Sequence, residues 1–253
     1  MFRKAIVRTP SASMAEGITS TDLGAPDLER ALSQHAAYVA ALEQCGLDVT
    51  VLPAEEAFPD ATFVEDCAVC TEHCAVITLP GAVSRQGERH SVQTALEGHY
   101  SELLAIREPG TLDGGDVMRA GNHFTIGLSQ RTNREGARQL SDTLSRFGFT
   151  AETLPLAHVL HLKTGLSYLE KNTLLVCGEF VSHPAFRHLD PIEVPEAEAY
   201  AANSLWVNGT VLIPRGFDET ERRIREKGYA VITLQMSEFR KMDGGLSCLS
   251  LRF

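Results

Sequence analysis

The sequence predicts an α/β fold built from about five repeated helix–strand–hairpin units along 253 residues. Short strand-like runs end near a proline or a polar break, and each is followed by further strand-like residues that could form a hairpin. The single runs lie at residues 47–52, 103–107, 150–154, 191–194 and 229–234. Because no low-complexity segment or Gly/Ser-rich linker separates them, we expect one domain over residues 1–253.

The hairpin candidates lie at residues 62–79, 112–126, 165–176, 204–213 and 246–253. Two of them contain turn signals, at residues 119–122 and in the pair Asn208-Gly209. The last candidate has no second strand of its own. The strand-like residues 5–9 near the start of the chain are its obvious partner.

Three amphipathic helices are expected between these units, at residues 27–45, 134–147 and 218–227. Asn133 is an expected N-cap of the second helix, because its side chain can accept a hydrogen bond from a free backbone N–H. A glycine follows each helix, as is common where a helix stops, at Gly46, Gly148 and Gly228. An α/β chain of another topology could produce the same alternation of helices and strands.

Composition excludes several classes of protein. The chain has 43% hydrophobic and 22% charged residues and a net charge of −10, so it is globular and nucleic acid is not an expected partner. No apolar run reaches the roughly 18–20 residues of a membrane helix, and residues 1–8 do not resemble a signal peptide. The six cysteines are expected to be thiols in a reducing cytoplasm.

Three groups of residues could carry chemistry. Cys248 follows two glycines, which let the backbone present a thiol nucleophile in a cavity, although it could also be a buried cysteine of a last strand. His161 could be a general acid or base, or a core residue between two leucines. In residues 110–116, two carboxylates lie among three glycines; they could orient a histidine or simply form a turn.

Other charged residues suggest a ligand with both signs of charge. The adjacent carboxylates of Glu65 and Asp66 would suit a guanidinium, which a carboxylate can hold through two parallel hydrogen bonds, or they could lie at a solvated strand edge. Arg85 and Arg131 could each hold a carboxylate or lie on the surface.

The cysteines Cys67, Cys70 and Cys74, with His73, have a spacing that could bind zinc or an iron–sulfur cluster. No second cysteine pair follows, and the segment alternates like a hairpin, which favours structural thiols. No dinucleotide-binding motif or phosphate-binding loop is present.

Four motifs, in this order, resemble those of the dimethylarginine dimethylaminohydrolase family. They are FVED at 63–66, GTLDGGD at 110–116, HLKTG at 161–165 and DGGLSCLSLRF at 243–253. That family belongs to the guanidine-modifying superfamily, with arginine deiminases and amidinotransferases. The resemblance implies a five-bladed, pseudo-symmetric β/α propeller, the pentein fold, with an active site on its pseudo-fivefold axis. It also gives the spare N-terminal strand the role of closing a blade.

The resemblance implies a role for each matching residue. Cys248 would be the nucleophile, His161 the general acid and base, and Asp113 the carboxylate that supports the histidine, where some relatives have Glu. The residues implied in substrate binding are Ile18, Asp60, Glu65, Asp66, Arg85, Arg131 and Met242. Ile18 and Met242 would act mainly through their backbone.

The activity implied is hydrolysis of asymmetric dimethylarginine and monomethylarginine to citrulline and dimethylamine or methylamine, through a covalent cysteine intermediate. The only partner implied is this small guanidino substrate, without metal or cofactor, and the family allows for a homodimer. An arginine deiminase or another guanidine-modifying hydrolase is the alternative, although such chains are usually longer and deiminases carry a helical insertion. A non-enzymatic metal or redox protein built on the cysteine cluster is a more distant alternative.

Overall fold

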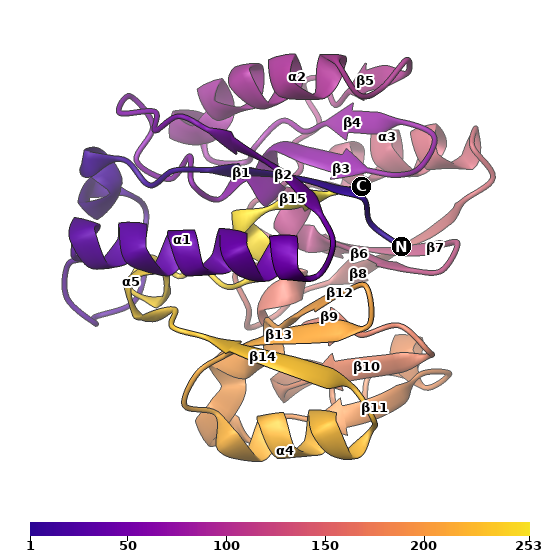
Figure 1. The fold of residues 1–253 in the computed structure, drawn as a ribbon. Coiled ribbons are helices and arrows are strands. Elements are labelled where there is room, and N and C mark those ends of the chain that lie inside the picture. The colour runs from indigo at the N-terminus through magenta and orange to yellow at the C-terminus, as the bar shows by residue number, and fades with distance from the viewer.

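The computed structural model describes residues 1–253 and contains five three-stranded sheets (Figure 1). In strand order they are β15-β1-β2, β3-β4-β5, β6-β7-β8, β9-β10-β11 and β12-β13-β14. In each sheet, the middle strand pairs antiparallel with one neighbour and parallel with the other. The five predicted units are therefore confirmed.

The strands are β1 Lys4–Arg8, β2 Asp48–Leu52, β3 Ala68–Cys70, β4 Ala75–Ile77, β5 Leu103–Ala105, β6 Val117–Ala120, β7 His123–Leu128, β8 Thr150–Pro155, β9 Leu166–Tyr168, β10 Thr173–Val176, β11 Asp190–Glu193, β12 Leu205–Val207, β13 Thr210–Pro214, β14 Ala230–Leu234 and β15 Leu251–Arg252. The helices are α1 Leu28–Gln44, α2 Arg89–Glu97, α3 Arg134–Ser145, α4 Asp218–Glu226 and α5 Ser237–Arg240. No helix combines the length and the apolar character needed to cross a membrane.

A helix usually carries the chain from the middle strand to its parallel neighbour. Helices α1, α2, α3 and α4 make this crossover in four of the sheets. Between β10 and β11 the crossover has only short 3₁₀ turns, one of which begins at Pro184. A helix of normal length is not expected there, because the sequence lacks an amphipathic run and proline lacks a backbone N–H.

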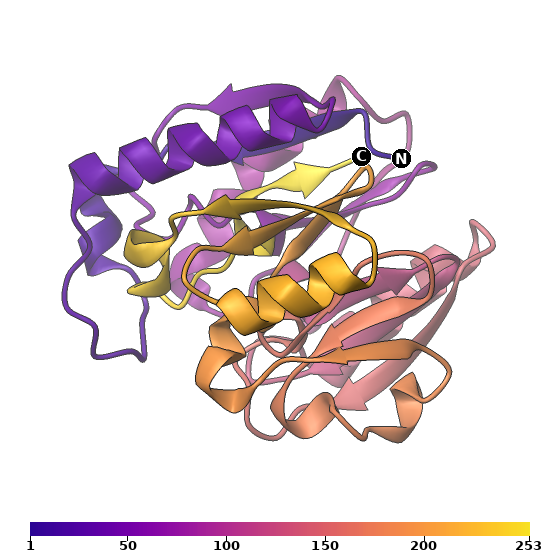
Figure 2. The same cartoon turned by 60° about the horizontal axis from the view of Figure 1, so that its bottom comes forward.

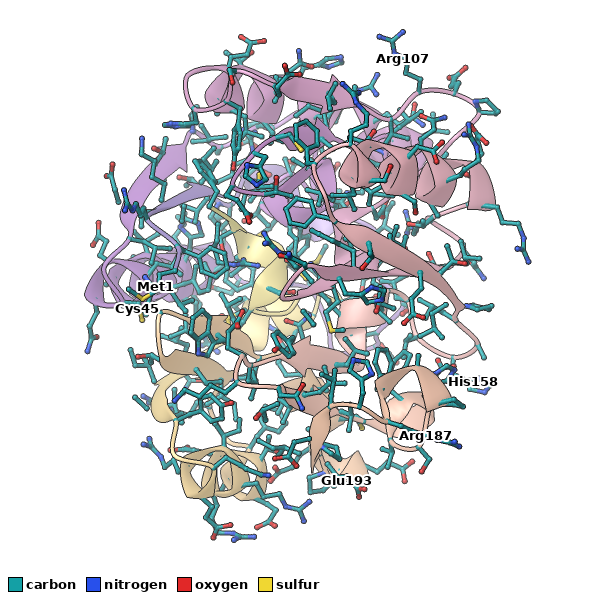
Figure 3. All side chains as sticks on the ribbon, turned by 90° about the vertical axis from the view of Figure 1, so that its right-hand side faces the viewer. Met1, Cys45, Arg107, His158, Arg187 and Glu193 are labelled. Atoms are coloured by element: carbon teal, nitrogen blue, oxygen red, sulfur yellow. The ribbon has the colours of Figure 1, made fainter.

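The five sheets form a closed ring because each hydrophobic core lies between two of them. For example, one core contains Val69 of β3 and Ile126 of β7, and the next contains Met118 of β6 and Leu174 of β10. The other three cores join the fourth sheet to the fifth, the fifth to the first, and the first to the second. Outside the ring, charged side chains such as Arg107, Arg187 and Glu193 extend into solvent (Figure 3).

The first sheet joins the two ends of the chain, which lie side by side (Figures 1 and 2). Ile6 of β1 lies opposite Leu251 of β15, and the N–H groups of Arg3 and Lys4 donate to the carbonyl of Phe253 at 2.9 and 2.8 Å. The expected pairing of residues 5–9 with the last hairpin segment is confirmed.

The helix signals in the sequence are also confirmed. Helices α1, α3 and α4 lie within the three predicted ranges, and the Asn133 side chain accepts the N–H of Gly136 at 2.8 Å. Gly46, Gly148 and Gly228 have φ between 83° and 87°, a left-handed conformation that favours glycine. Helices α2 and α5 were not predicted, because α2 has no side-chain cap and α5 has only four residues.

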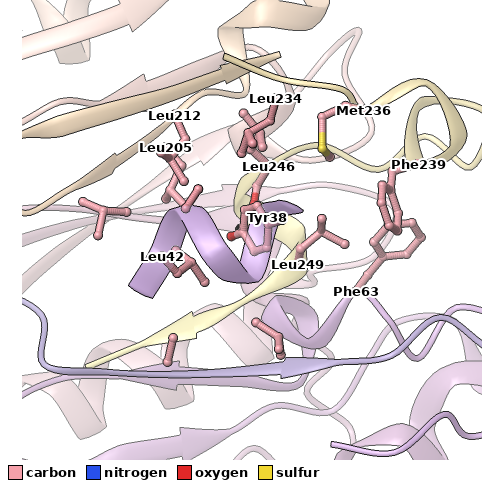
Figure 4. Close-up of a cluster of buried hydrophobic side chains, with 14 of the residues drawn as sticks. Tyr38, Leu42, Phe63, Leu205, Leu212, Leu234, Met236, Phe239, Leu246 and Leu249 are labelled. Carbon is pink, nitrogen blue, oxygen red and sulfur yellow. Dashed lines mark hydrogen bonds between the residues drawn. The ribbon is translucent and has the colours of Figure 1, made fainter. Parts of the chain in front are cut away.

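The largest core fixes the C-terminal segment against α1 (Figure 4). Within it, the buried Tyr38 hydroxyl lies 2.9 Å from the carbonyl of Leu246 and 2.6 Å from the Ser250 hydroxyl. These two residues flank Cys248, so the hydrogen bonds hold the segment that carries this cysteine.

We expect Tyr38→Phe to lower the free energy of unfolding by about 1–2 kcal/mol, because it leaves buried polar groups without a partner. Urea denaturation measures this change. Tyr168→Phe is the matched control: its hydroxyl accepts the N–H of Asn172 in a partly exposed site, where water can replace it. Equal effects of the two substitutions would contradict the role given to Tyr38.

Candidate active site

Two glycines bring Cys248 to the centre of the ring. Cys248 lies in the 3₁₀ turn Ser247–Leu249, between α5 and β15. A Cβ atom on Gly244 would collide with the ring of Phe63, and one on Gly245 would collide with the Asn203 side chain. Only glycine allows this close approach, and the Gly245 N–H then points to the Cys248 sulfur at 3.4 Å.

His161 and Asp113 form a buried pair. The Nε2 atom of His161 lies 2.9 Å from Asp113 Oδ2, and the other oxygen of Asp113 accepts the N–H of Gly81 at 2.8 Å. Burial alone would lower the pKa of His161, but the carboxylates of Asp66, Asp113 and Asp116 raise it to about 9. Although burial opposes it, the hydrogen bond from His161 holds the pKa of Asp113 below its usual value. The histidine is therefore charged at neutral pH.

Asp66 is held by a buried arginine. Its Oδ1 accepts the N–H of Gly115 at 2.9 Å, and its Oδ2 pairs with Arg85 at 2.7 Å. Arg85 also pairs with both oxygens of Glu88, at 3.0 and 2.8 Å, and its Nη2 reaches the carbonyl of Phe63 at 3.3 Å. Only one N–H of Arg85 has no partner within the chain. Arg85 is thus largely a support for Asp66, and one donor remains for a ligand.

A small cavity of about 40 Å³ brings most of the predicted site residues together. Cys248 and His161 line it. Six of the seven residues predicted to bind substrate also line it: Ile18, Asp60, Asp66, Arg85, Arg131 and Met242. Asp113 lies directly behind His161 and is fully buried.

Glu65 is the exception and lines an adjoining cavity of about 340 Å³, which Cys248 and His161 also line. Its carboxylate pairs with Lys163 at 2.6 Å and Arg252 at 3.1 Å, and it accepts the Ser247 hydroxyl at 2.8 Å. Sequence reasoning did not single out Lys163 or Arg252. The signal was present, since both belong to motifs that carry the family resemblance.

The small cavity is lined by charges of both signs. The carboxylate of Asp60 accepts the N–H of Ile18 at 3.1 Å, and burial raises the pKa of this carboxyl group. The guanidinium of Arg131, in contrast, is partly exposed and has no hydrogen-bond or ion-pair partner in the chain. The cavity therefore offers a free cation to a carboxylate, and carboxylates to a ligand's positive groups.

Asp243 connects the cavity to the loop that carries Ile18. It is a non-glycine residue with a left-handed backbone, at φ 58°, and it lines both cavities. Its carboxylate accepts the backbone N–H and the hydroxyl of Ser20, at 2.6 and 2.9 Å. The sequence analysis did not identify Asp243 as a residue of the cavity or as a contact of this loop, although Asp243 lies in the last motif.

The carboxylates also affect the ionisation of the Cys248 thiol. Burial, together with the charges of Glu65 and Asp66, raises the pKa of Cys248 to about 12. Without a ligand, Cys248 is therefore a neutral thiol in the same cavity as a charged imidazole. A cation bound between them would favour the thiolate.

One set of residues could hold a metal ion. Single ligand atoms of Asp66, Asp113 and His161 lie within 4.8 Å of one another. All four carboxylate oxygens already bind a protein donor, from Gly115, Arg85, Gly81 and His161. No carboxylate oxygen of this set is therefore without a protein donor, and the absence of a metal stays a prediction.

The cysteine cluster does not form in the structure. Cys67 and Cys74 lie in different hydrophobic cores, and both are free thiols, as is Cys70. Burial raises the pKa of each thiol, which disfavours the thiolate that a metal needs. The structure therefore gives no support to a metal or redox site on these cysteines, and it favours structural thiols.

The chain is similar to known enzymes along its whole length. A family model described as N,N dimethylarginine dimethylhydrolase, eukaryotic, matches residues 24–248. The N(G),N(G)-dimethylarginine dimethylaminohydrolase of Pseudomonas aeruginosa is 50% identical, with 100% of both chains covered. The protein of the same name from Streptomyces coelicolor is 33% identical over 99% of this chain and 96% of its own.

Solved structures agree with this likeness. A cysteine-to-serine mutant of the P. aeruginosa enzyme in complex with citrulline has a TM-score of 0.99, at 50% identity and with 100% of both chains covered. The N-terminal domain of a cyanobacterial arginine dihydrolase has a TM-score of 0.89 at 19% identity, over 100% of this chain and 97% of its own. That second likeness concerns the fold alone. Together with the five sheets, these structures confirm the predicted pentein fold.

We expect the unliganded protein to contain a neutral Cys248 thiol at pH 8, because nearby carboxylates oppose its ionisation. The ultraviolet absorbance of thiolates, followed against pH and compared with Cys248→Ser, measures this ionisation. A difference should appear only far above the usual range for a thiol. A full thiolate signal at pH 7 in the free protein would contradict the charge balance described above.

Proposed function

This chain belongs to the dimethylarginine dimethylaminohydrolase family and hydrolyses Nω-methylated arginines, and we propose that Cys248, His161 and Asp113 carry out the reaction. The observation that supports these roles is the cavity in which Cys248 and His161 lie beside six residues suited to an amino-acid substrate. Asp113 supports His161 from behind. We also propose that residues 1–253 form a single catalytic domain, since every core joins two sheets.

We infer the orientation of the substrate from the free charges in the cavity. Arg131 has an unpaired guanidinium and holds the substrate carboxylate, while Asp60 and the backbone of Ile18 and Met242 surround its amino group. Asp66 faces the guanidinium of the substrate, with Glu65 contributing charge from the adjoining cavity. Arg85 supports Asp66 and offers one N–H to the ligand.

The first half of the reaction begins when the substrate guanidinium enters this negative site. Its positive charge lowers the pKa of Cys248, and the thiol loses its proton to water. The thiolate attacks the central guanidinium carbon and forms a C–S bond. His161 donates its proton to the methylated nitrogen, the C–N bond breaks, and methylamine or dimethylamine leaves. A thiouronium-type covalent intermediate remains.

The second half uses the same two residues. His161 is now neutral and takes a proton from water, whose oxygen attacks the same carbon. The C–S bond then breaks, the Cys248 thiolate takes the remaining hydroxyl proton to restore the thiol, and citrulline leaves. Asp113 holds the imidazole ring throughout, because its carboxylate is fixed by Gly81 on the opposite side. No step requires a metal ion or an organic cofactor.

Solved structures of relatives support a small guanidino substrate. One dimethylarginine dimethylaminohydrolase structure contains citrulline, and another, a histidine-to-glycine variant, is an adduct with S-methyl-L-thiocitrulline. A homodimer, a cytoplasmic location and the absence of nucleic-acid or membrane partners remain predictions.

We expect citrulline release from asymmetric dimethylarginine, little or none from symmetric dimethylarginine, and slower release from arginine. Cys248→Ser should lower kcat by on the order of 10³-fold or more, because the nucleophile is lost. A colorimetric citrulline assay measures both. Arginine turnover as fast as that of the methylated substrate would favour an arginine deiminase, and an active Cys248→Ser variant would contradict the mechanism.

We expect Arg131→Ala to raise KM by roughly 10–100-fold while kcat changes less, because a charged hydrogen bond is lost far from the reacting carbon. Steady-state kinetics on asymmetric dimethylarginine measure this separation. Arg134→Ala is the matched control, since Arg134 is an exposed arginine three residues further along the chain, at the start of α3. An unchanged KM for Arg131→Ala would remove Arg131 from the substrate site.

A further inference from the structure

A buried carboxylate outside the cavity connects the segments that carry His161 and Arg131. We propose that Asp116 is a positioning residue that fixes His161 and Arg131 relative to each other. Asp116 lines neither cavity at Cys248 and is fully buried. The inference rests on the proposed roles of His161 as acid and base and of Arg131 as the carboxylate clamp.

Asp116 accepts three hydrogen bonds and pairs with no cation. Its Oδ2 accepts the hydroxyls of Ser129 and Thr132, at 2.6 and 2.7 Å, and its Oδ1 accepts the backbone N–H of Leu162 at 3.0 Å. These donors come from two loops, one after β7 and one before β9. A buried charge without a cation is costly, and three donors are what make it tolerable here.

The hydroxyl groups of Ser129 and Thr132 fix the backbone of the turn that carries Arg131. The Ser129 oxygen accepts the backbone N–H of Arg131 at 2.9 Å and that of Thr132 at 3.1 Å. The Thr132 hydroxyl accepts the N–H of Asp113 at 3.1 Å, so the same network reaches the carboxylate that supports the histidine. Through these hydroxyls, Asp116 sets the position of the Arg131 backbone against Asp113.

The third hydrogen bond fixes the backbone next to His161. The N–H of Leu162 belongs to the peptide that joins it to His161, and the Leu162 side chain is fully buried. Asp116 thus holds the backbone of His161, and Asp113 holds its imidazole ring. Together they restrict the position of the side chain. Asp66, Asp113 and Asp116 face His161 from other segments, Cys248 lies across the cavity, and the neighbouring Lys163 is paired with Glu65.

The hydrogen-bond directions require a carboxylate at this position. The Ser129 oxygen already accepts two N–H groups, so its own hydrogen can only be donated, and Asp116 receives it. If an asparagine kept its oxygen toward Leu162, its NH₂ group would face this hydroxyl donor. The turn carrying Arg131 would then have to shift, although asparagine has nearly the same shape as aspartate.

The experiment compares Asp116→Asn with Ser129→Ala on the full chain, using asymmetric dimethylarginine. We expect Asp116→Asn to lower kcat and to raise KM, each by roughly 10-fold. We also expect the high-pH limb of its kcat profile to move to lower pH, because loss of a negative charge disfavours the protonated imidazole. Ser129→Ala should raise KM, leave kcat within about 2-fold, and keep the wild-type pH profile.

Controls separate positioning from loss of folding. Asp142→Asn changes an exposed carboxylate on α3 and should match the wild type in all three measurements. Thermal unfolding identifies a variant that does not fold. In that case Thr132→Val and its conservative counterpart Thr132→Ser complete the test, since only the serine keeps the hydroxyl and should retain wild-type KM.

The outcomes distinguish this inference from the proposed function. A folded Asp116→Asn variant with wild-type kcat, KM and pH profile overturns the inference, as does a Thr132→Val variant with wild-type KM where Asp116→Asn does not fold. A wild-type protein that releases no citrulline from methylated arginine instead overturns the proposed function.

Discussion

The structure depends on keeping several carboxylates out of water at the centre of the ring. Asp60, Glu65, Asp66, Asp113 and Asp116 are all buried, where an unpaired charge would be strongly destabilising. Cations compensate some of them: Arg85 for Asp66, and Lys163 with Arg252 for Glu65. Asp60 and Asp116 pair with no cation and are held by hydrogen-bond donors alone. The five sheets supply the surrounding loops that hold these partners in place.

The buried carboxylates set the protonation of the two residues proposed for catalysis. Asp66, Asp113 and Asp116 raise the pKa of His161, and burial with Glu65 and Asp66 raises the pKa of Cys248. In the proposed mechanism, a bound guanidinium places positive charge next to the sulfur and so favours the thiolate. Substrate recognition and activation of the thiol would then depend on the same carboxylates.

Much of this arrangement could be predicted from the sequence, because its signals are local. The strand runs, the Asn133 cap and the glycines after helices define their own surroundings, and the motifs mark Cys248, His161 and Asp113. What could not be predicted depends on partners distant in the chain. Lys163 and Arg252 meet Glu65 only after the ring closes, and Asp116 acts through hydroxyls on another loop. Arg85 was expected to face the ligand, yet four of its five N–H groups are used internally.

The pairing of β15 with β1 has a consequence for how the protein is made. The strand that completes the first sheet follows Cys248 in the chain, and its partner β1 precedes the other fourteen strands. During translation β1 must therefore remain without this neighbour until the end of the fifth sheet has emerged. Until that moment a nascent chain lacks both Cys248 and the closed ring. Closure of the ring is therefore a late event in the folding of this domain on the ribosome.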